Sequence, residues 1–281
     1  MAYPFRHSLC NEIFHPPGVE SPYTFEAACR KIRGIGYAGI EIAPFTLAES
    51  PQWITAAVRR ELRATIVNEG LEFVGLHWLM LSPKGLHVTT PDNALRERSW
   101  THVRQLIDLC ADLGDNGVMV FGSPGQRSTT GGSSPVDSTK RFRDGFAAIA
   151  QQAEERGVTV LVEALPRAQS DVVNTVAEAV EIVKYCASPA IQTMFDSHNA
   201  ADETEPHGQV IEKHWQWIRH VHVNEMDGKH CGCGDYDFES LLKVLADNRY
   251  TGWVSLEAFD FSFGAETIAR ESLSHLQEAN K

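Results

Sequence analysis

Four polar side chains of kinds that bind metal ions stand at the ends of apolar runs in the sequence. Two Glu, one Asp and one His make an oxygen-rich ligand set with coordination positions left open, which favours Mn²⁺, with Mg²⁺ or Co²⁺ as alternatives, over Zn²⁺. Without a cation, three neighbouring carboxylates would repel one another. Taken singly, each residue could instead be a surface carboxylate, a loop cap or a packed histidine. The joint pattern predicts one divalent metal held by Glu163, Asp196, His222 and Glu257.

The elements that must position these residues follow a repeating pattern of strand and helix. Short runs rich in Val, Ile, Leu and Phe alternate with longer amphipathic stretches. We predict strands at 7–13, 38–43, 72–78, 117–121, 158–163, 191–196, 218–223 and 253–257. We predict helices near 24–34, 52–69, 92–113, 138–156, 174–186, 206–216, 238–247 and 264–279.

Eight such repeats in 281 residues give about 35 residues per unit, which predicts a single (β/α)8 TIM barrel, an α/β fold, over residues 1–281. The alternative is an open doubly wound sheet, which usually carries a G-x-G-x-x-G turn after its first strand. This chain has no such turn there. In a barrel the carboxyl ends of adjacent parallel strands lie side by side, so the four ligands would converge.

The composition disfavours nucleic-acid and membrane partners. A formal net charge of −12 opposes binding to a phosphate backbone. No stretch approaches the roughly 20 apolar residues that a membrane span needs. The start, MAYPFRHSLCNEIF, lacks the features of a signal peptide, so we expect a cytoplasmic protein. The six scattered cysteines predict reduced thiols, and the Cys231 and Cys233 pair predicts a Gly-rich loop rather than a zinc site.

Six short motifs carry a resemblance to a known family: GYAGIEI (36–42), VGLHWL (74–79), LVEALP (161–166), MFDSHN (194–199), HVHVNEMDG (220–228) and LEAF (256–259). The chain resembles the sugar phosphate isomerase/epimerase family of xylose-isomerase-like TIM barrels, which includes ketose 3-epimerases and hydroxypyruvate isomerases. The resemblance implies that Glu163 and Glu257 are also the acid/base pair. It further implies a metal-dependent isomerase or epimerase that forms an enediolate from a small ketose or related keto-sugar, its small-molecule partner.

The chain also departs from the ketose 3-epimerase pattern at positions expected to contact substrate. His198 follows the metal-binding Asp by two positions rather than three, and Gly228 stands where those enzymes have an Arg. Lys229 and Arg127 are candidates for binding a phosphate or carboxylate on the substrate, or are solvated. The predicted substrate-binding residues are His77, Trp78, His198, Gln169 and Lys229.

Other functions remain open at this point. A metal-dependent lyase, either a dehydratase of the inosose or dehydroshikimate kind or a keto-glycoside-cleaving enzyme, could use the same site. A DNA-repair role like that of endonuclease IV is disfavoured, because Phe121-Gly-Ser-Pro124 supplies no additional His after the fourth strand. A non-catalytic subunit is a further alternative. Trp215 and Trp217 either form the interface of a homo-oligomer or pack on the barrel. We expect Glu41 to be an interior hydrogen-bonding group. We expect His220 to lie one layer below His222 on the same strand face.

Overall fold

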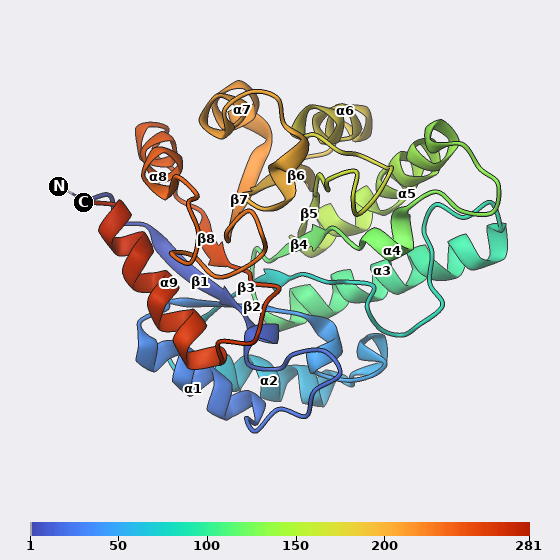
Figure 1. Cartoon of the computed structure of the whole chain (residues 1–281). Coiled ribbons are helices and arrows are strands. Elements are labelled where there is room, and N and C mark those ends of the chain that lie inside the picture. The colour runs from blue at the N-terminus through green and yellow to red at the C-terminus, as the bar shows by residue number, and fades with distance from the viewer. Residues whose placement is uncertain (1) are drawn as a thin grey trace.

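The computed structural model describes residues 2–281 and shows eight parallel strands that close into a barrel in sequence order (Figure 1). The strands are β1 (Arg6–Cys10), β2 (Gly39–Ile42), β3 (Glu72–Leu76), β4 (Val118–Phe121), β5 (Thr159–Val162), β6 (Ile191–Asp196), β7 (Ile218–Val223) and β8 (Trp253–Leu256). β8 pairs with β1 and closes the sheet. The predicted (β/α)8 TIM barrel is confirmed.

The helices form a ring around the strands (Figure 1). They are α1 (Phe25–Ile35), α2 (Ala56–Asn68), α3 (Asn93–Leu113), α4 (Pro124–Arg127), α5 (Pro135–Arg156), α6 (Val176–Cys186), α7 (His207–His214), α8 (Phe238–Asp247) and α9 (Ala265–Ala279). Six of them begin after a Ser, Thr or Asp whose side chain accepts a hydrogen bond from a backbone N–H of the first turn: Thr24, Thr55, Asp92, Ser134, Thr175 and Asp237.

The predicted bounds differ most from the structure at the first strand and the second helix. β1 ends at Cys10, and residues 11–13 form a 3-10 turn. The side chain of Asn11 stabilises this turn, because its Oδ1 accepts a hydrogen bond from the N–H of Ala43 and its Nδ2 donates one to the hydroxyl of Thr46. Residues 51–53 form a separate 3-10 turn, so α2 begins only after its cap at Thr55. The short helix α4, which starts at a proline after β4, was not predicted.

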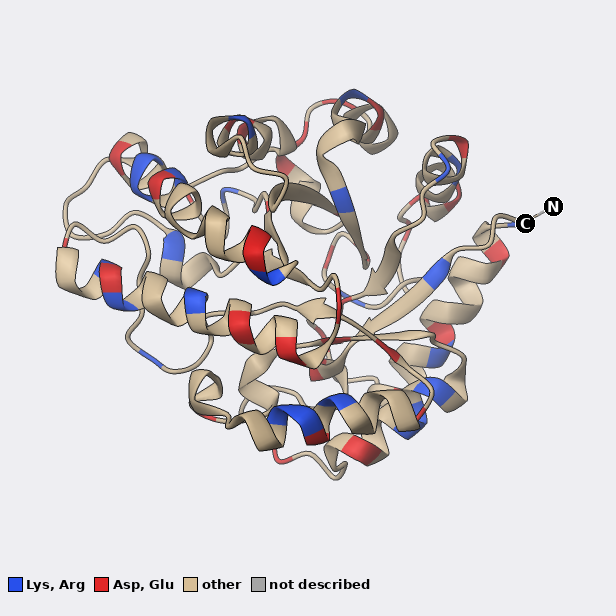
Figure 2. Cartoon of the chain, turned by 180° about the vertical axis from the view of Figure 1, so that it is seen from behind, with Lys and Arg blue, Asp and Glu red and all other residues tan. Residues whose placement is uncertain are grey.

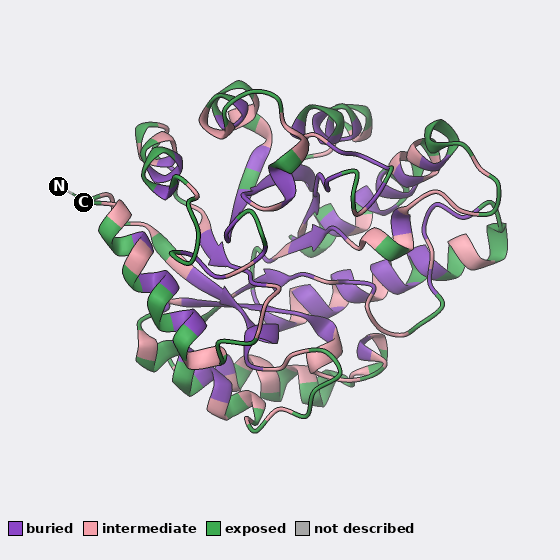
Figure 3. Ribbon diagram, viewed as in Figure 1, coloured by how far each residue is buried: buried purple, intermediate pink, exposed green. Residues whose placement is uncertain are grey.

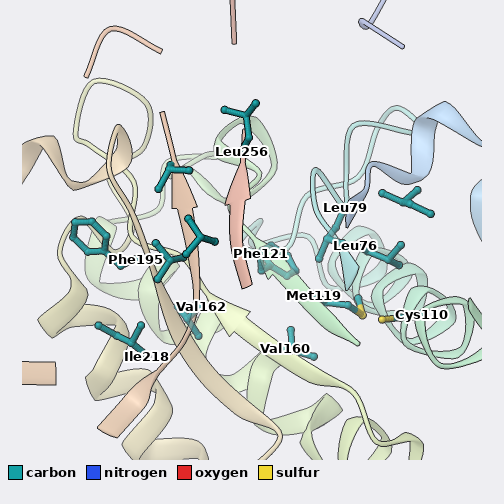
Figure 4. Close-up of a cluster of buried hydrophobic side chains, with 14 of the residues drawn as sticks. Leu76, Leu79, Cys110, Met119, Phe121, Val160, Val162, Phe195, Ile218 and Leu256 are labelled. Atoms are coloured by element: carbon teal, nitrogen blue, oxygen red, sulfur yellow. The ribbon is translucent and has the colours of Figure 1, made fainter. Parts of the chain in front are cut away.

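The apolar core has two parts. A large shell fills the space between the barrel and the helices, so the helices are buried on their inner faces and exposed outside (Figure 3). Figure 4 shows part of this shell, with side chains that include Leu76, Met119 and Val162. A smaller cluster of Val120, Leu161 and Met194 comes from β4, β5 and β6. Alternation along β5 and β6 puts Leu161 and Met194 on the same strand faces as Glu163 and Asp196, so these apolar side chains support the strand ends that carry the carboxylates.

Acidic and basic residues are interspersed along the outer helices (Figure 2). Across residues 2–281, no helix is both long and apolar enough to span a membrane. Trp215 and Trp217 are only partly buried, but both pack against the core. Both residues therefore pack on the barrel, and the homo-oligomer stays a prediction.

Candidate metal centre and substrate pocket

The structure brings the four predicted metal ligands together at the carboxyl ends of β5 to β8. Glu163 and Glu257 directly follow β5 and β8, Asp196 ends β6, and His222 lies in β7. One ligand atom from each lies within 4.8 Å of all the others. All four residues are at most 5% exposed. The convergence follows from the register, since Asp196 and His222 are direct neighbours across the β6/β7 pair.

The charges of this cluster are incompletely balanced by the chain itself. Burial, followed by the charges of Asp196 and Glu257, raises the pKa of Glu163 to about 8. Nδ1 of His222 lies 3.0 Å from Oε2 of Glu257 and 3.6 Å from Oδ2 of Asp196. That Asp196 oxygen is buried and has no hydrogen-bond partner. A buried acceptor without a donor, beside a Glu163 carboxyl whose pKa is raised by burial and by its acidic neighbours, fits a divalent cation.

Glu41 of β2 supports His222 from the side opposite the cluster. Its carboxylate lies 3.0 Å from Nε2 of His222 and 2.8 Å from Nε2 of His220, and it accepts a hydrogen bond from the Ser255 hydroxyl. Burial opposes ionisation of Glu41, but the His222 and His220 rings hold its pKa well below the usual range. Glu41 and His220 therefore occupy the interior positions expected from the sequence. A carboxylate on Nε2 leaves Nδ1 of His222 free to face the ligand cluster.

Replacing Glu41 with Gln is expected to weaken metal binding by about 10- to 100-fold, because the amide no longer fixes the tautomer and basicity of His222. The dissociation constant for Mn²⁺ can be measured by competition with a fluorescent chelator. The exposed Glu72 of β3 provides the matched control, Glu72→Gln. Equal Mn²⁺ affinity in Glu41→Gln and the wild type would contradict this role.

Glu163 and Glu257 each accept a hydrogen bond from a neutral donor on one carboxylate oxygen, Oε1. Nδ2 of Asn199 donates to Oε1 of Glu163 at 2.8 Å, and Nε1 of Trp78 donates to Oε1 of Glu257 at 2.7 Å. The backbone N–H of Asn199 also donates to Asp196. Gly122 makes room for this arrangement, because a Cβ there would collide with Oε2 of Glu163. Asn199 was not predicted as a site residue, although it lies in the MFDSHN motif one residue after His198.

A cavity of about 720 Å³ opens above the cluster and includes Glu163 and Glu257 in its lining. Three of the predicted substrate-binding residues also line it: Trp78, His198 and Gln169. Nδ1 of His198 pairs with the carbonyl of Met226, and the Gln169 amide contacts His198 and Asn199. Other lining residues, most of them apolar or in loops, were not predicted from the sequence: Leu81, Val120, Ser123, Pro124, Gln126, Leu165, Asp227 and Phe259.

Two predicted substrate-binding residues lie outside the lining. His77 is fully buried, and its Nε2 lies 2.6 Å from a carboxylate oxygen of Glu12. It follows β3 directly, whereas the next residue, Trp78, has a left-handed backbone with φ of 48° and faces the cavity. Lys229 pairs with Asp227 at 2.7 Å through its Nζ. The structure thus places Trp78 in the cavity lining and His77 in the buried interior. The charge of Lys229 is paired with Asp227.

Arg127 was predicted to be a loop residue that either binds a substrate anion or is solvated, and its burial contradicts the solvated alternative. The side chain is fully buried at the end of α4. Its guanidinium donates to the backbone carbonyls of Phe121, Glu163 and Val173, at 3.3, 2.6 and 2.8 Å. Arg127 therefore ties the ends of β4 and β5 to the loop that follows β5, and it is not among the residues that line the cavity.

Replacing Arg127 with Met is expected to lower the free energy of unfolding by about 3 kcal/mol or more, because buried carbonyls lose their donors. Urea unfolding followed by circular dichroism measures this change. Arg167→Met is the control, since the Arg167 side chain is 63% exposed. A loss below about 1 kcal/mol, typical of a surface substitution, would refute the structural role.

All six cysteines are free thiols, as expected from their scatter along the chain. Cys231 is buried and Cys233 is exposed. The Gly-rich loop nevertheless brings Cys233 beside His230 and Glu271, with one ligand atom of each within 4.8 Å of the others. The third member comes from α9, so this group could not be read from the local Cys-x-Cys spacing.

The fold and the ligand cluster define a TIM-barrel protein with a candidate divalent-metal centre at the carboxyl ends of its strands. The chain belongs to the xylose isomerase-like TIM barrel family, whose profile matches residues 29–279. It is similar to the D-psicose 3-epimerase of Agrobacterium fabrum, with 29% identity over 130 residues, or 45% of each chain. It is also similar to the 3-dehydro-D-guloside 4-epimerase of Escherichia coli, with 22% identity over 275 residues, or 95% of this chain and 97% of the relative.

Solved structures show the same fold. The D-psicose 3-epimerase of Clostridium cellulolyticum, crystallised with D-tagatose, superposes with a TM-score of 0.84, 18% identity, and coverage of 99% of this chain and 100% of that chain. At this identity the likeness concerns the fold alone. The Agrobacterium match spans about half the length of that relative.

Proposed function

We propose that the protein is a divalent-metal-dependent sugar epimerase or isomerase, which moves a proton on a carbon next to a carbonyl of a small ketose or related keto-sugar. The observation that carries the proposal is the cluster of Glu163, Asp196, His222 and Glu257, with ligand atoms within 4.8 Å of one another beside the cavity. Relatives named as ketose 3-epimerases and as a keto-glycoside 4-epimerase support it.

The same four residues would hold the cation, for which Mn²⁺ is our first choice and Mg²⁺ or Co²⁺ the alternatives. When bound, it would polarise the substrate carbonyl and stabilise the negative charge that develops when the neighbouring C–H loses its proton. Glu163 and Glu257 come from different strands, β5 and β8, and both line the cavity. One carboxylate takes the proton from one face of the substrate, and the other returns a proton to the opposite face, which inverts the carbon.

The residues around the two carboxylates set their geometry for this exchange. Asn199 and Trp78 each hold one oxygen, so the other oxygen of each carboxylate is available to the cluster or the substrate. His198 and Gln169 offer polar groups to sugar hydroxyls at the cavity wall. We propose these two and Trp78 as the substrate-binding residues.

Proton NMR in D₂O tests the reaction directly. The enzyme and Mn²⁺ are incubated with a panel of ketoses, keto-glycosides and inososes, and both C–H exchange and new products are followed. Deuterium at one carbon together with an epimeric or isomeric product supports the proposal. Exchange followed by loss of water or of an aglycone would assign the site to a lyase instead. Complete absence of exchange with a Mn²⁺-loaded protein would argue against proton abstraction.

A further inference from the structure

The cavity has an apolar wall beside the ligand cluster. Trp78 and Phe259 both line it, with their rings parallel to within 5° and ring centres 6.1 Å apart. Phe45 stacks on Trp78 from another direction, with ring centres 5.8 Å apart. The apolar lining is completed by Leu81, Val120, Pro124 and Leu165. The cavity volume of about 720 Å³ lies in the range of about 300–1,000 Å³ that is typical of pockets for drug-sized ligands, so the wall has room for a group beyond a monosaccharide.

The charges in the lining are negative. Among the described residues that line the cavity, the charged side chains are Glu163, Glu257 and Asp227, and there is no Lys or Arg. Lys229 and Arg127 lie outside this lining, Lys229 paired with Asp227 and Arg127 donating to backbone carbonyls. A phosphate or carboxylate on the part of the substrate remote from the metal ligands would therefore meet carboxylates, apolar groups and neutral polar groups, without a Lys or Arg in the described lining to compensate its charge.

The backbone at Gly228 keeps a side chain out of this wall. Its φ is 80°, a left-handed conformation that favours glycine, and a Cβ there would lie 3.1 Å from Cδ2 of Phe259. The carbonyl of Gly228 also accepts a hydrogen bond from the N–H of Phe259 at 2.8 Å. The Phe259 ring thus packs directly over Gly228. At this part of the cavity wall the chain presents an aromatic ring and no polar side chain from residue 228.

We propose that the substrate is an uncharged keto-sugar that carries a flat apolar substituent, as in an aryl glycoside, with the sugar at the ligand cluster and the substituent on Trp78 and Phe259. This inference rests on the proposed function of the same site and specifies its substrate class. Aromatic side chains bind such a group through burial of apolar area and ring stacking.

Three matched probes test the substrate class: phenyl 3-keto-β-D-glucoside, its methyl analogue, and the 6-phosphate of the methyl compound. The rate of C–H exchange in D₂O is measured with the Mn²⁺-loaded protein. We expect kcat/KM for the phenyl compound to exceed that for the methyl compound at least tenfold, and the phosphate to react at least tenfold more slowly than the methyl compound. Equal rates on the phenyl and methyl compounds, or faster exchange of the phosphate, would overturn the inference while leaving the proposed reaction intact.

Single substitutions test whether the aromatic wall, and no other part of the site, produces the preference for the phenyl compound. Phe259→Ala should remove the preference for the phenyl compound, whereas Phe263→Ala, at a 44% exposed ring outside the lining, should not. Gln126→Lys places a cation in the lining and should raise kcat/KM for the phosphate at least tenfold. A phenyl preference that survives in Phe259→Ala would contradict the assignment of the wall.

A binding measurement distinguishes failure of the inference from failure of the proposed function. Phenyl β-D-glucoside has no keto group and cannot react, so its binding reports the wall alone, by calorimetry. If none of the keto compounds exchanges but phenyl glucoside binds in a Phe259-dependent way, the proposed reaction fails and the apolar subsite stands. If phenyl glucoside binds no better than methyl glucoside, the subsite is refuted whatever the exchange data show.

Discussion

Glu257→Gln is expected to lower kcat by a factor on the order of 10³, at saturating Mn²⁺, because an amide cannot carry the proton to or from the substrate. Gln has nearly the same volume as Glu, and its carbonyl can still accept the hydrogen bond from Nε1 of Trp78. The fold should therefore persist, with an unchanged circular dichroism spectrum. Metal affinity should also fall, since Glu257 contributes one of the four ligand atoms.

Isotope exchange makes this prediction sharper. If Glu163 and Glu257 serve opposite faces, the variant should still exchange the C–H of the epimer that Glu163 deprotonates, without forming the other epimer. The exposed Glu278 of α9 provides the control, and Glu278→Gln should keep full activity. Epimer formation within tenfold of the wild-type rate in Glu257→Gln would rule out Glu257 as an acid/base residue.

Chelation of divalent metal by EDTA is expected to reduce turnover to less than about one-thousandth, with recovery on addition of Mn²⁺, because substrate polarisation by the cation is worth several kcal/mol. Mn²⁺ should also raise the melting temperature of the metal-free protein, since it binds the folded state. Asp196→Asn should lose most of this thermal shift, because the buried Oδ2 that lacks a partner would no longer be charged. Full activity after exhaustive chelation would refute a metal-dependent reaction.

The metal affinity should also depend on pH, with a sign set by Glu163. Burial and the neighbouring carboxylates raise its pKa from 4.5 to about 8 in the metal-free protein, and the proton must leave before the carboxylate binds a cation. Affinity for Mn²⁺ should therefore rise as pH increases from 6 to 8, by up to about tenfold per unit.

The stability of the metal-free protein should change in the opposite direction. Between pH 4.5 and about 8 the unfolded state has lost the Glu163 proton while the folded state retains it, so the free energy of unfolding falls as pH rises through this window. The Mn²⁺-induced rise in melting temperature should accordingly be largest near pH 8. Calorimetry at several pH values checks both trends, and a pH-independent Mn²⁺ affinity between 6 and 8 would contradict them.

The strand ends show why part of the site was predictable. Glu163, Asp196 and Glu257 each end a local apolar run, and His222 shares the strand period of two with His220. Parallel pairing in a closed barrel brings successive strand ends together whatever the loops do. The candidate ligands were therefore identifiable from a repeat that is visible in the sequence. Their convergence follows from the barrel fold.

The surroundings of the ligands depended on contacts between distant segments. Arg127 is buried because carbonyls of Glu163 and Val173 converge on it, and no local signal distinguishes it from a solvated loop arginine. His77 and Trp78 are adjacent, and only the left-handed backbone at Trp78 decides which of them reaches the cavity. Loop conformations of this kind have no periodicity that a sequence pattern could reveal.

By itself the sequence determined the barrel, the order of its strands and the four candidate ligands, because apolar periodicity and strand-end chemistry are local properties. The tertiary structure alone decided that Asn199 and Trp78 hold the two glutamates, that Glu41 backs His222, and that the pocket wall is aromatic and free of cations in its described lining. Those features arise where loops from different strands meet, and burial there depends on residues far apart in the chain.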